Sequence, residues 1–298
     1  MIPVYNEADI IGSVIDHLTT EGVQSVVLDN GSTDGSFEIC SKLLGNGVLA
    51  IERMATEKFE FNRIVNKLYE MALNCNPNWV LLNAADEFLE SPYPGVTLGK
   101  AIELEDGRGH NLIQFNNFEF WPTKLDKDEL DVRRRLRYYT WNDDLQFRAW
   151  KVAPGIRLTG TAGHYPTFPK HLQTKVPKIK YILRHYRIRS YEHGLRKVFK
   201  ERRPRYLEEE QKKGLHVHYT NFQPSEKFFI IDPRNLNRYD EDGKWVVKKT
   251  FDWTWGFQGK RWANPPVGSL TVSVAGRIPY AARIWKALFL RKYREDKT

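Results

Sequence analysis

The chain has 298 residues, 41% hydrophobic and 13% aromatic, so it can bury a large core and global disorder is excluded. Its two cysteines, Cys40 and Cys75, have no paired spacing, which excludes a disulfide framework or a zinc finger and fits a reducing compartment. It contains no run of about 18 apolar residues that could span a bilayer, and we expect no signal peptide. The sequence therefore predicts a folded cytoplasmic protein.

The net charge of +9 hides two parts of opposite sign. Residues 1–110 hold 7 Lys and Arg against 17 Asp and Glu, a net of −10, whereas the remainder holds 39 against 20, a net of +19. This asymmetry suggests two roles, and the basic part could meet nucleic acid, anionic lipid or a phosphorylated substrate. An ordinary solvated surface is the plainer alternative.

The first 110 residues alternate between helical and extended patterns. Apolar residues at helical spacing predict three helices, the first capped by Asn6, over residues 7–20, 37–44 and 61–72. Apolar runs predict strands over residues 25–29, 48–52 and 79–83. MIPVYNE resembles the tail of an earlier strand that is either short or missing its beginning. Strands separated by such helices indicate βαβ units, so we predict an α/β fold with a mostly parallel sheet.

The pattern changes beyond residue 110. Residues 110–121 alternate in part and predict a strand at a sheet edge, whereas the charged residues 122–147 predict a loop. Two more strands are predicted over 147–152 and 156–161, and a helix capped by Ser190 over residues 190–201.

The end of the chain is basic and rich in tryptophan, with Trp253, Trp255, Trp262 and Trp285 among Lys and Arg. A small packed subdomain is the plainest interpretation. Residues 277–298 could also form a helix that lies on an anionic membrane surface.

Polar residues gather just after three of the predicted strands. They are residues 5–7 (YNE), residues 29–35 (DNGSTDG) and residues 86–87 (DE). Ligands of open α/β sheets bind outside the carboxyl ends of the strands, so the shared position indicates a binding site. Taken singly, residues 29–35 are also typical of a turn with a helix cap, and residues 86–87 of a helix N-terminus.

In this order the motifs VYNEADIIGSVIDHL, VVLDNGSTDGS and ADEFLE resemble the family-two glycosyltransferases, bacterial nucleotide-sugar-dependent enzymes of the GT-A fold. The resemblance covers residues 1–120 well and residues 145–205 more loosely. It implies a Rossmann-like sheet flanked by helices. It also implies inverting, metal-assisted transfer of a sugar from a nucleotide-diphosphate sugar to a saccharide or lipid-linked acceptor, in surface polysaccharide or glycan assembly.

The resemblance also suggests how the chain is divided. We predict a GT-A domain over residues 1–220, with a donor half over 1–110 and an acceptor half over 111–220. A basic, tryptophan-rich extension over 221–298 follows. Its possible contact with an anionic membrane would place a cytoplasmic protein peripherally at the inner face of the membrane.

The family's Asp-x-Asp motif binds a divalent cation, Mn²⁺ or Mg²⁺, that offsets the charge of the leaving diphosphate. Here the motif reads Ala84-Ala85-Asp86, so Asp86 matches the second Asp and the first is missing. Glu87 matches the acidic residue that often follows, and Asp86 and Glu87 are the candidate catalytic pair.

In many relatives a downstream histidine completes the metal site. His185 and His164 are the candidates to join Asp86, although a lone histidine is more often structural. Asn83, one residue from the missing Asp, could compensate for it only in part.

The resemblance assigns other residues to the nucleotide. Tyr5 matches the aromatic that lies against the base, and Glu7 an acidic group near the ribose. Asn30 can hydrogen-bond a pyrimidine edge, which favours UDP or dTDP. Arg63 falls where the family has a basic residue near the diphosphate, with an ordinary surface role as the alternative. The full nucleotide-sugar set is Pro3, Tyr5, Asn6, Glu7, Asp29, Asn30, Gly31, Arg63 and Asn83.

An inverting enzyme needs a general base for the acceptor hydroxyl. The sequence offers Glu119, Asp143, Asp144 and Glu192 without deciding among them.

Two other functions stay open. A non-catalytic nucleotide-sugar-binding protein is suggested by Ala84, which departs from the metal motif. A nucleic-acid-binding protein is suggested by the basic part of the chain, but no nucleic-acid motif accompanies that charge, so nucleic acid is not the favoured partner.

Overall fold

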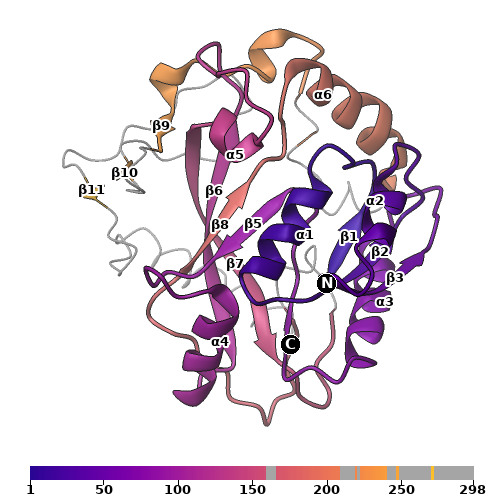
Figure 1. Ribbon diagram of the computed structural model, residues 1–298, viewed down its shortest axis with the longest axis vertical. Coiled ribbons are helices and arrows are strands. Elements are labelled where there is room, and N and C mark those ends of the chain that lie inside the picture. The colour runs from indigo at the N-terminus through magenta and orange to yellow at the C-terminus, as the bar shows by residue number, and fades with distance from the viewer. Residues whose placement is uncertain (159–165, 209–218, 220–221, 240–245, 248–269, 272–298) are drawn as a thin grey trace, which may run out of the picture.

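The computed structural model describes residues 1–158, 166–208, 219, 222–239, 246–247 and 270–271. It has the predicted α/β architecture, with helices packed around two sheets (Figure 1). No helix in the described part of the chain is long and apolar enough to cross a membrane.

The first sheet is parallel and comes from the βαβ pattern of the N-terminal part. Its strands, in the order β1-β2-β3, are Ile2–Val4, Ser25–Asp29 and Val48–Arg53. Helices α1 (Ile11–Thr20) and α2 (Ser36–Lys42) connect them, and α3 (Phe61–Leu73) follows. The apolar stripes that predict these helices form their buried faces.

The second sheet is mixed and has the order β4-β7-β6-β8-β5, with β9 paired to β7. Among its pairs, β6 and β8 are parallel and the others antiparallel. The strands are β4 (Trp79–Leu81), β5 (Glu87–Glu90), β6 (Leu112–Trp121), β7 (Tyr138–Lys151), β8 (Tyr181–His185) and β9 (Asn237–Arg238). A separate pair joins β10 (Val246–Val247) to β11 (Leu270–Thr271).

Backbone hydrogen bonds at Met1 link the two sheets. The Met1 amino group donates to the Leu81 carbonyl over 2.8 Å, and the Asn83 N–H donates to the Met1 carbonyl over 3.0 Å. The end of β4 therefore lies beside the start of β1, which joins the segment after β4 to the N-terminal strand.

Two sequence predictions beyond residue 110 are wrong. β6 is a central strand between β7 and β8 rather than a sheet edge, and nearly all its residues are buried on both faces. Residues 122–147 are not one loop, because helix α5 (Val132–Arg135) and most of β7 lie there. The charged residues of this segment show no strand pattern, so the sequence does not predict this part of β7. The strand pairs with β6 along nearly its whole length. The strand predicted over 156–161 is, in its described part, a single bridge from Arg157 to Thr167.

Asn6 does not cap the first helix, which begins at Ile11, and its backbone has a positive φ of 54°. Its side chain instead accepts a hydrogen bond from the Thr33 N–H and donates one to Glu201. The Ser190 cap is confirmed, since its hydroxyl accepts from the His193 N–H. Helix α6 (Tyr191–Leu195) continues as a π-helix over Arg196–Arg202, a geometry that often marks functional sites.

The remaining helices are short connectors around this body. They are α4 (Leu98–Gly107) and three 3₁₀ turns at Arg203–Arg205, Glu226–Phe228 and Pro233–Asn235. Phe222, Phe229 and Leu236 share a hydrophobic cluster with Trp121 and Val198. Most of the extension predicted over 221–298, including its five tryptophans, lies outside the described residues, and its boundary stays a prediction.

Candidate functional site

Polar segments that follow three strands gather at one edge of the structure. Val4 at the end of β1 pairs with Asp29 at the end of β2, and Met1 joins β1 to the end of β4. The polar segments 5–7, 29–35 and 83–87 follow these strands, so they share the edge at which ligands of open α/β sheets bind. The chain from β8 to the π-helix supplies the cations that face them.

Asp86 is a buried carboxylate held by two cationic partners. Its Oδ2 lies 2.7 Å from Lys197 Nζ, and its Oδ1 lies 3.4 Å from His185 Nε2. Burial alone would raise the pKa of Asp86, but the charges of Lys197 and His185 hold it well below its usual value. Asp86 is therefore ionised and already neutralised by the protein.

Glu7 is the second buried carboxylate and has three cationic partners. Its Oε1 accepts from Lys197 Nζ over 2.6 Å and from Arg202 Nη2 over 3.3 Å, and its Oε2 accepts from Arg189 Nη2 over 2.7 Å. The side chains of Glu7, Lys197 and Arg189 are each 2% exposed. Lys197 thus bridges the carboxylates that follow β1 and β4.

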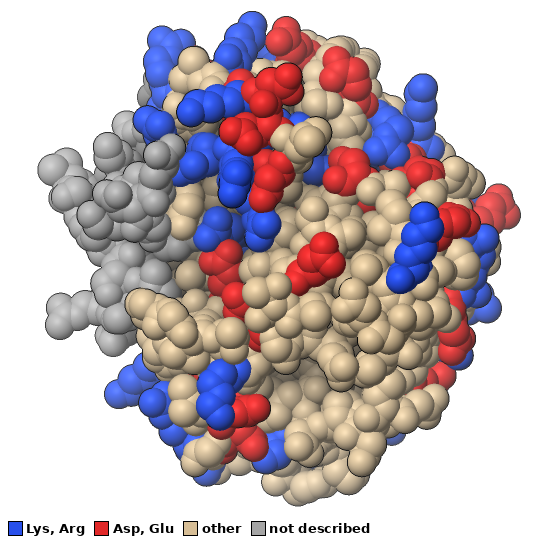
Figure 2. Space-filling model, viewed as in Figure 1, with Lys and Arg blue, Asp and Glu red and all other residues tan. Residues whose placement is uncertain are grey.

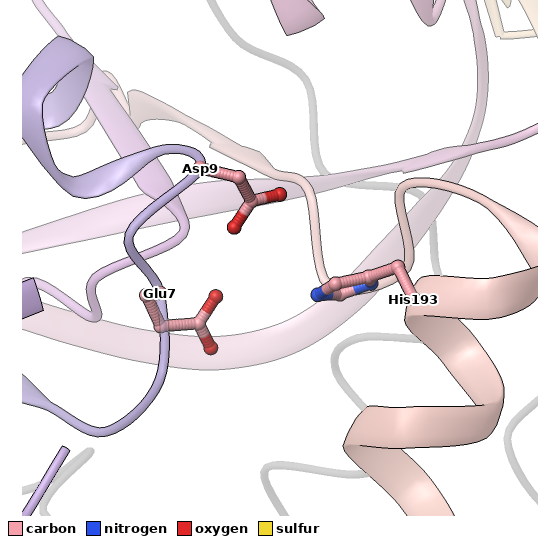
Figure 3. Close-up of side chains that lie close together, drawn as sticks. All are labelled: Glu7, Asp9 and His193. Atoms are coloured by element: carbon pink, nitrogen blue, oxygen red, sulfur yellow. The ribbon is translucent and has the colours of Figure 1, made fainter. Parts of the chain in front are cut away.

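Asp9 and His193 lie beside Glu7, and their side chains converge with it (Figure 3). One ligand atom from each of the three residues lies within 4.8 Å of the others, as a metal site would require. However, Arg189 occupies the space between the carboxylates, donating to Asp9 over 2.7 and 2.6 Å and to Glu7. The His193 Nδ1 accepts the Arg189 N–H over 3.2 Å, which leaves the proton of a neutral ring on Nε2. Neither ring nitrogen then offers a lone pair to a metal.

His185 ends β8 and contacts Asp86, as expected from its predicted place in the site. Burial alone would lower the pKa of His185, but the charge of Asp86 and the hydrogen bond to it raise the pKa above its usual value. This favours a protonated ring as the partner of Asp86. His164, the other candidate, lies outside the described residues.

A divalent cation does not fit this arrangement. Three carboxylates, from Glu7, Asp9 and Asp86, face three fixed cations, Arg189, Lys197 and Arg202. These cations already neutralise the carboxylates, His185 is a further partner of Asp86, and position 84 is an alanine that supplies no ligand.

Glu87 and Asn83 hold the loop around Asp86 in place. Glu87 Oε1 lies 2.6 Å from Arg148 Nη2 on β7, and its Oε2 accepts the Ala84 N–H over 2.8 Å. The Asn83 amide donates to the carbonyls of Ala84 and Glu87 over 2.6 and 3.0 Å. Both side chains are buried and hold the loop that carries Asp86, and the Asn83 Oδ1 has no hydrogen-bond partner among the described residues.

Asp29 and Gly31 shape the turn after β2. The Asp29 carboxylate accepts the N–H groups of Gly31 and Ser32 and the Nε of Arg53. Gly31 has a φ of 84°, and a Cβ there would lie 3.0 Å from the Ala55 Cβ, so glycine suits this position. These two residues build the edge of the site.

Tyr5 and Asn30, the residues predicted to face the base, are covered by Arg205. The Arg205 guanidinium lies 3.9 Å from the centre of the Tyr5 ring, and its Nη2 donates to Asn30 Oδ1. A second guanidinium, of Arg202, lies 5.8 Å from the Tyr5 ring. A base that stacks on this face of Tyr5 would therefore displace Arg205.

The other sequence candidates are less central. Pro3 is a half-buried residue of β1 paired with Leu28, and Arg63 forms an exposed ion pair with Glu60 over 3.3 Å on α3. Of the candidate bases, Glu119 is buried and paired with Arg187, whereas Glu192 is exposed. Asp143 and Asp144 lie in β7, and their side chains are outside the described part.

Sequence reasoning missed the four cations Arg189, Lys197, Arg202 and Arg205. The one sequence feature that could have indicated these cations is the opposite net charge of the two parts of the chain. In the structure, basic residues of the second part pair with acidic residues of the first. Figure 2 shows that acidic and basic side chains intermingle over the upper part of the visible face, with no large patch of one sign there.

His193 gives this cluster a measurable pH dependence. Burial and the charges of Arg189, Lys197 and Arg196 outweigh Asp86 and hold the pKa of His193 well below 6.5. The unfolded chain therefore binds a proton that the folded chain does not. Stability from this group is present above about pH 6.5 and is lost below it, by up to about 1.4 kcal/mol per pH unit.

Urea unfolding of the wild type and His193→Asn between pH 7 and pH 5 measures this effect. Asn can still accept the Arg189 N–H, and His185 titrates in both proteins, so the difference between them isolates His193. We expect the wild type to lose more stability than the variant as the pH falls, and the exposed His171→Asn to behave as wild type. Parallel curves for wild type and His193→Asn would refute the prediction.

No family model matches this sequence, and no curated protein matches it. Among solved structures, the chain is similar to S. aureus TarS 1-349 in complex with UDP, with a TM-score of 0.30 and 19% identity over 43% of this chain and 36% of that chain. It is also similar to S. aureus TarS 1-349 with a TM-score of 0.36 and 13% identity, over 74% of this chain and 69% of that chain. These likenesses are remote, and no assignment rests on them.

Proposed function

We propose that this protein is a glycosyltransferase that moves a sugar from a nucleotide-diphosphate sugar to a saccharide or lipid-linked acceptor. The observation that supports it is the cluster at the carboxyl edge of the parallel sheet, where Tyr5, Glu7 and Asp86 meet Lys197 and Arg202. An aromatic ring for a base beside fixed positive charge for phosphates is the combination that such a donor needs.

The donor is proposed to be a uridine or thymidine diphosphate sugar. The Asn30 side chain carries both a donor and an acceptor and could pair with a pyrimidine edge once Arg205 leaves its Oδ1 and Thr56 leaves its Nδ2.

The proposed reaction is an inverting displacement. The acceptor hydroxyl oxygen forms a bond to the anomeric carbon as the bond to the diphosphate breaks, and the hydroxyl proton passes to a carboxylate. The diphosphate leaves as an anion and needs positive charge close by. We assign the general base to none of the carboxylates described above.

Titration calorimetry with UDP, dTDP and GDP tests the donor site. Stacking of a base on an aromatic ring contributes about 1–3 kcal/mol, so we expect Tyr5→Ala to weaken binding of the preferred nucleotide about tenfold or more. Tyr93→Ala is the matched control, because Tyr93 bonds to Glu105 of α4 and is not part of the cluster. Equal affinities for wild type and Tyr5→Ala would rule out Tyr5 as the base platform.

A non-catalytic nucleotide-sugar-binding protein is the second candidate. Two observations support it. Ala84 stands where the metal motif has an acidic ligand, and Glu119, a candidate general base, is paired with Arg187. Tight nucleotide binding without turnover of any sugar nucleotide, with or without acceptors, would favour it over the enzyme.

Peripheral attachment to an anionic membrane is a separate proposal that rests on the basic segment 277–298. Pelleting with anionic liposomes should be lost when this segment is deleted, and unchanged pelleting would contradict the attachment.

A further inference from the structure

We propose that Lys197 and Arg202, rather than a divalent metal, supply the positive charge for the donor's diphosphate. The inference rests on the proposed function and concerns how the same site works. It differs from the expectation raised by the resemblance, in which Asp86 would bind Mn²⁺ or Mg²⁺.

Lys197 lies on one of the two oxygens through which Asp86 could hold a metal. Its ammonium bridges Glu7 Oε1 at 2.6 Å and Asp86 Oδ2 at 2.7 Å, and its side chain is 2% exposed. These carboxylates follow β1 and β4, the strand ends at which the donor is expected. Because its side chain is buried, Lys197 would act on the diphosphate through its charge rather than by a direct contact.

Charge balance argues against adding a metal to this cluster. Arg189, Lys197 and Arg202 neutralise the three negative charges of Glu7, Asp9 and Asp86, and His185 is a further partner of Asp86. A divalent ion would have to displace buried Lys197 from Asp86 or bring two uncompensated positive charges beside it. Asp86 and Glu7 therefore act as positioning residues for cations of the protein.

Arg202 connects the charged cluster to the proposed base platform. Its guanidinium contacts Glu7 Oε1 at 3.3 Å and lies 5.8 Å from the Tyr5 ring and 5.6 Å from the Phe59 ring. Its side chain is 18% exposed, more than those of Lys197 and Arg189. A guanidinium has five donors in a planar fork that suits phosphate, so Arg202 is placed to bind a diphosphate attached to a nucleoside on Tyr5.

Titration calorimetry of the full chain tests this inference without relying on any variant. UDP, dTDP and GDP are titrated in EDTA, in Mg²⁺ and in Mn²⁺. We expect the preferred nucleotide to bind with the same affinity in all three. Binding that requires Mg²⁺ or Mn²⁺ would overturn the inference and leave the proposed function standing, whereas no nucleotide binding in any buffer would refute both.

Arg202→Met gives a second, independent readout. A hydrogen bond to a charged group contributes enough that its loss should weaken binding of the diphosphate about tenfold or more. The matching nucleoside without phosphates, such as uridine, should lose much less. Lys200→Met is the control, because Lys200 is an exposed cation on the same π-helix. Equal losses for nucleoside and diphosphate, or no loss for either, would contradict a phosphate contact by Arg202.

Discussion

Replacing Lys197 with methionine is expected to lower the free energy of unfolding by about 3–5 kcal/mol, because two buried carboxylates lose a shared cation. Lys197 and Glu7 are 2% exposed at their side chains, and Asp86 is 9% exposed. Methionine keeps most of the length and the apolar stem of lysine, so the loss reports charge more than packing. Urea unfolding at neutral pH, followed by circular dichroism, measures it.

Two further variants make the Lys197 result specific. Lys200→Met removes an exposed lysine from the same helix and should change stability little. Adding Asp86→Asn to Lys197→Met should recover part of the loss, because it removes one of the uncompensated charges. A loss no greater than that of Lys200→Met would show that Lys197 does not bridge the two carboxylates.

Arg148→Met is also expected to lower the free energy of unfolding by about 3–5 kcal/mol, because it leaves Glu87 buried without its cation. The two side chains are 6% and 2% exposed and meet at 2.6 Å. Glu87 would keep the hydrogen bond from the Ala84 N–H but lose its cation. The loop that presents Asp86 is tied to β7 through this pair, so nucleotide binding should weaken together with stability.

Lys151→Met is the matched control on the same strand. Lys151 pairs with Asp106 over 2.6 Å, but the two side chains are 47% and 33% exposed, and pairs of this kind add little to stability. Adding Glu87→Gln to Arg148→Met should restore part of the stability. Similar losses for Arg148→Met and Lys151→Met would contradict a buried ion pair at Glu87.

The N-terminal fold follows from patterns that are local in the sequence. The apolar stripe of α1 and the apolar runs of β2 and β3 each lie within a short stretch of sequence, and the structure confirms them. β7 could not be found in this way. It pairs with β4 and β9, which are distant in sequence, and with the preceding strand β6, and it begins just after the charged RRRLR segment.

The location of the site followed from the sequence, but its electrostatics did not. Strand-end polar residues predict where Glu7 and Asp86 lie, because parallel strands bring their carboxyl ends together. Their partner Lys197 is 190 residues from Glu7 and 111 from Asp86, and no local pattern specifies such contacts. The sequence therefore suggests a metal at Asp86, whereas the fold places an ammonium there.

Release of nucleotide diphosphate from a panel of sugar nucleotides, measured in EDTA, tests the central claim most directly. The account predicts that at least one uridine or thymidine diphosphate sugar is cleaved by the full chain without added metal, faster with an acceptor, and that Arg202→Met slows the release. Failure to bind or cleave any sugar nucleotide, in EDTA or with Mn²⁺, would contradict it.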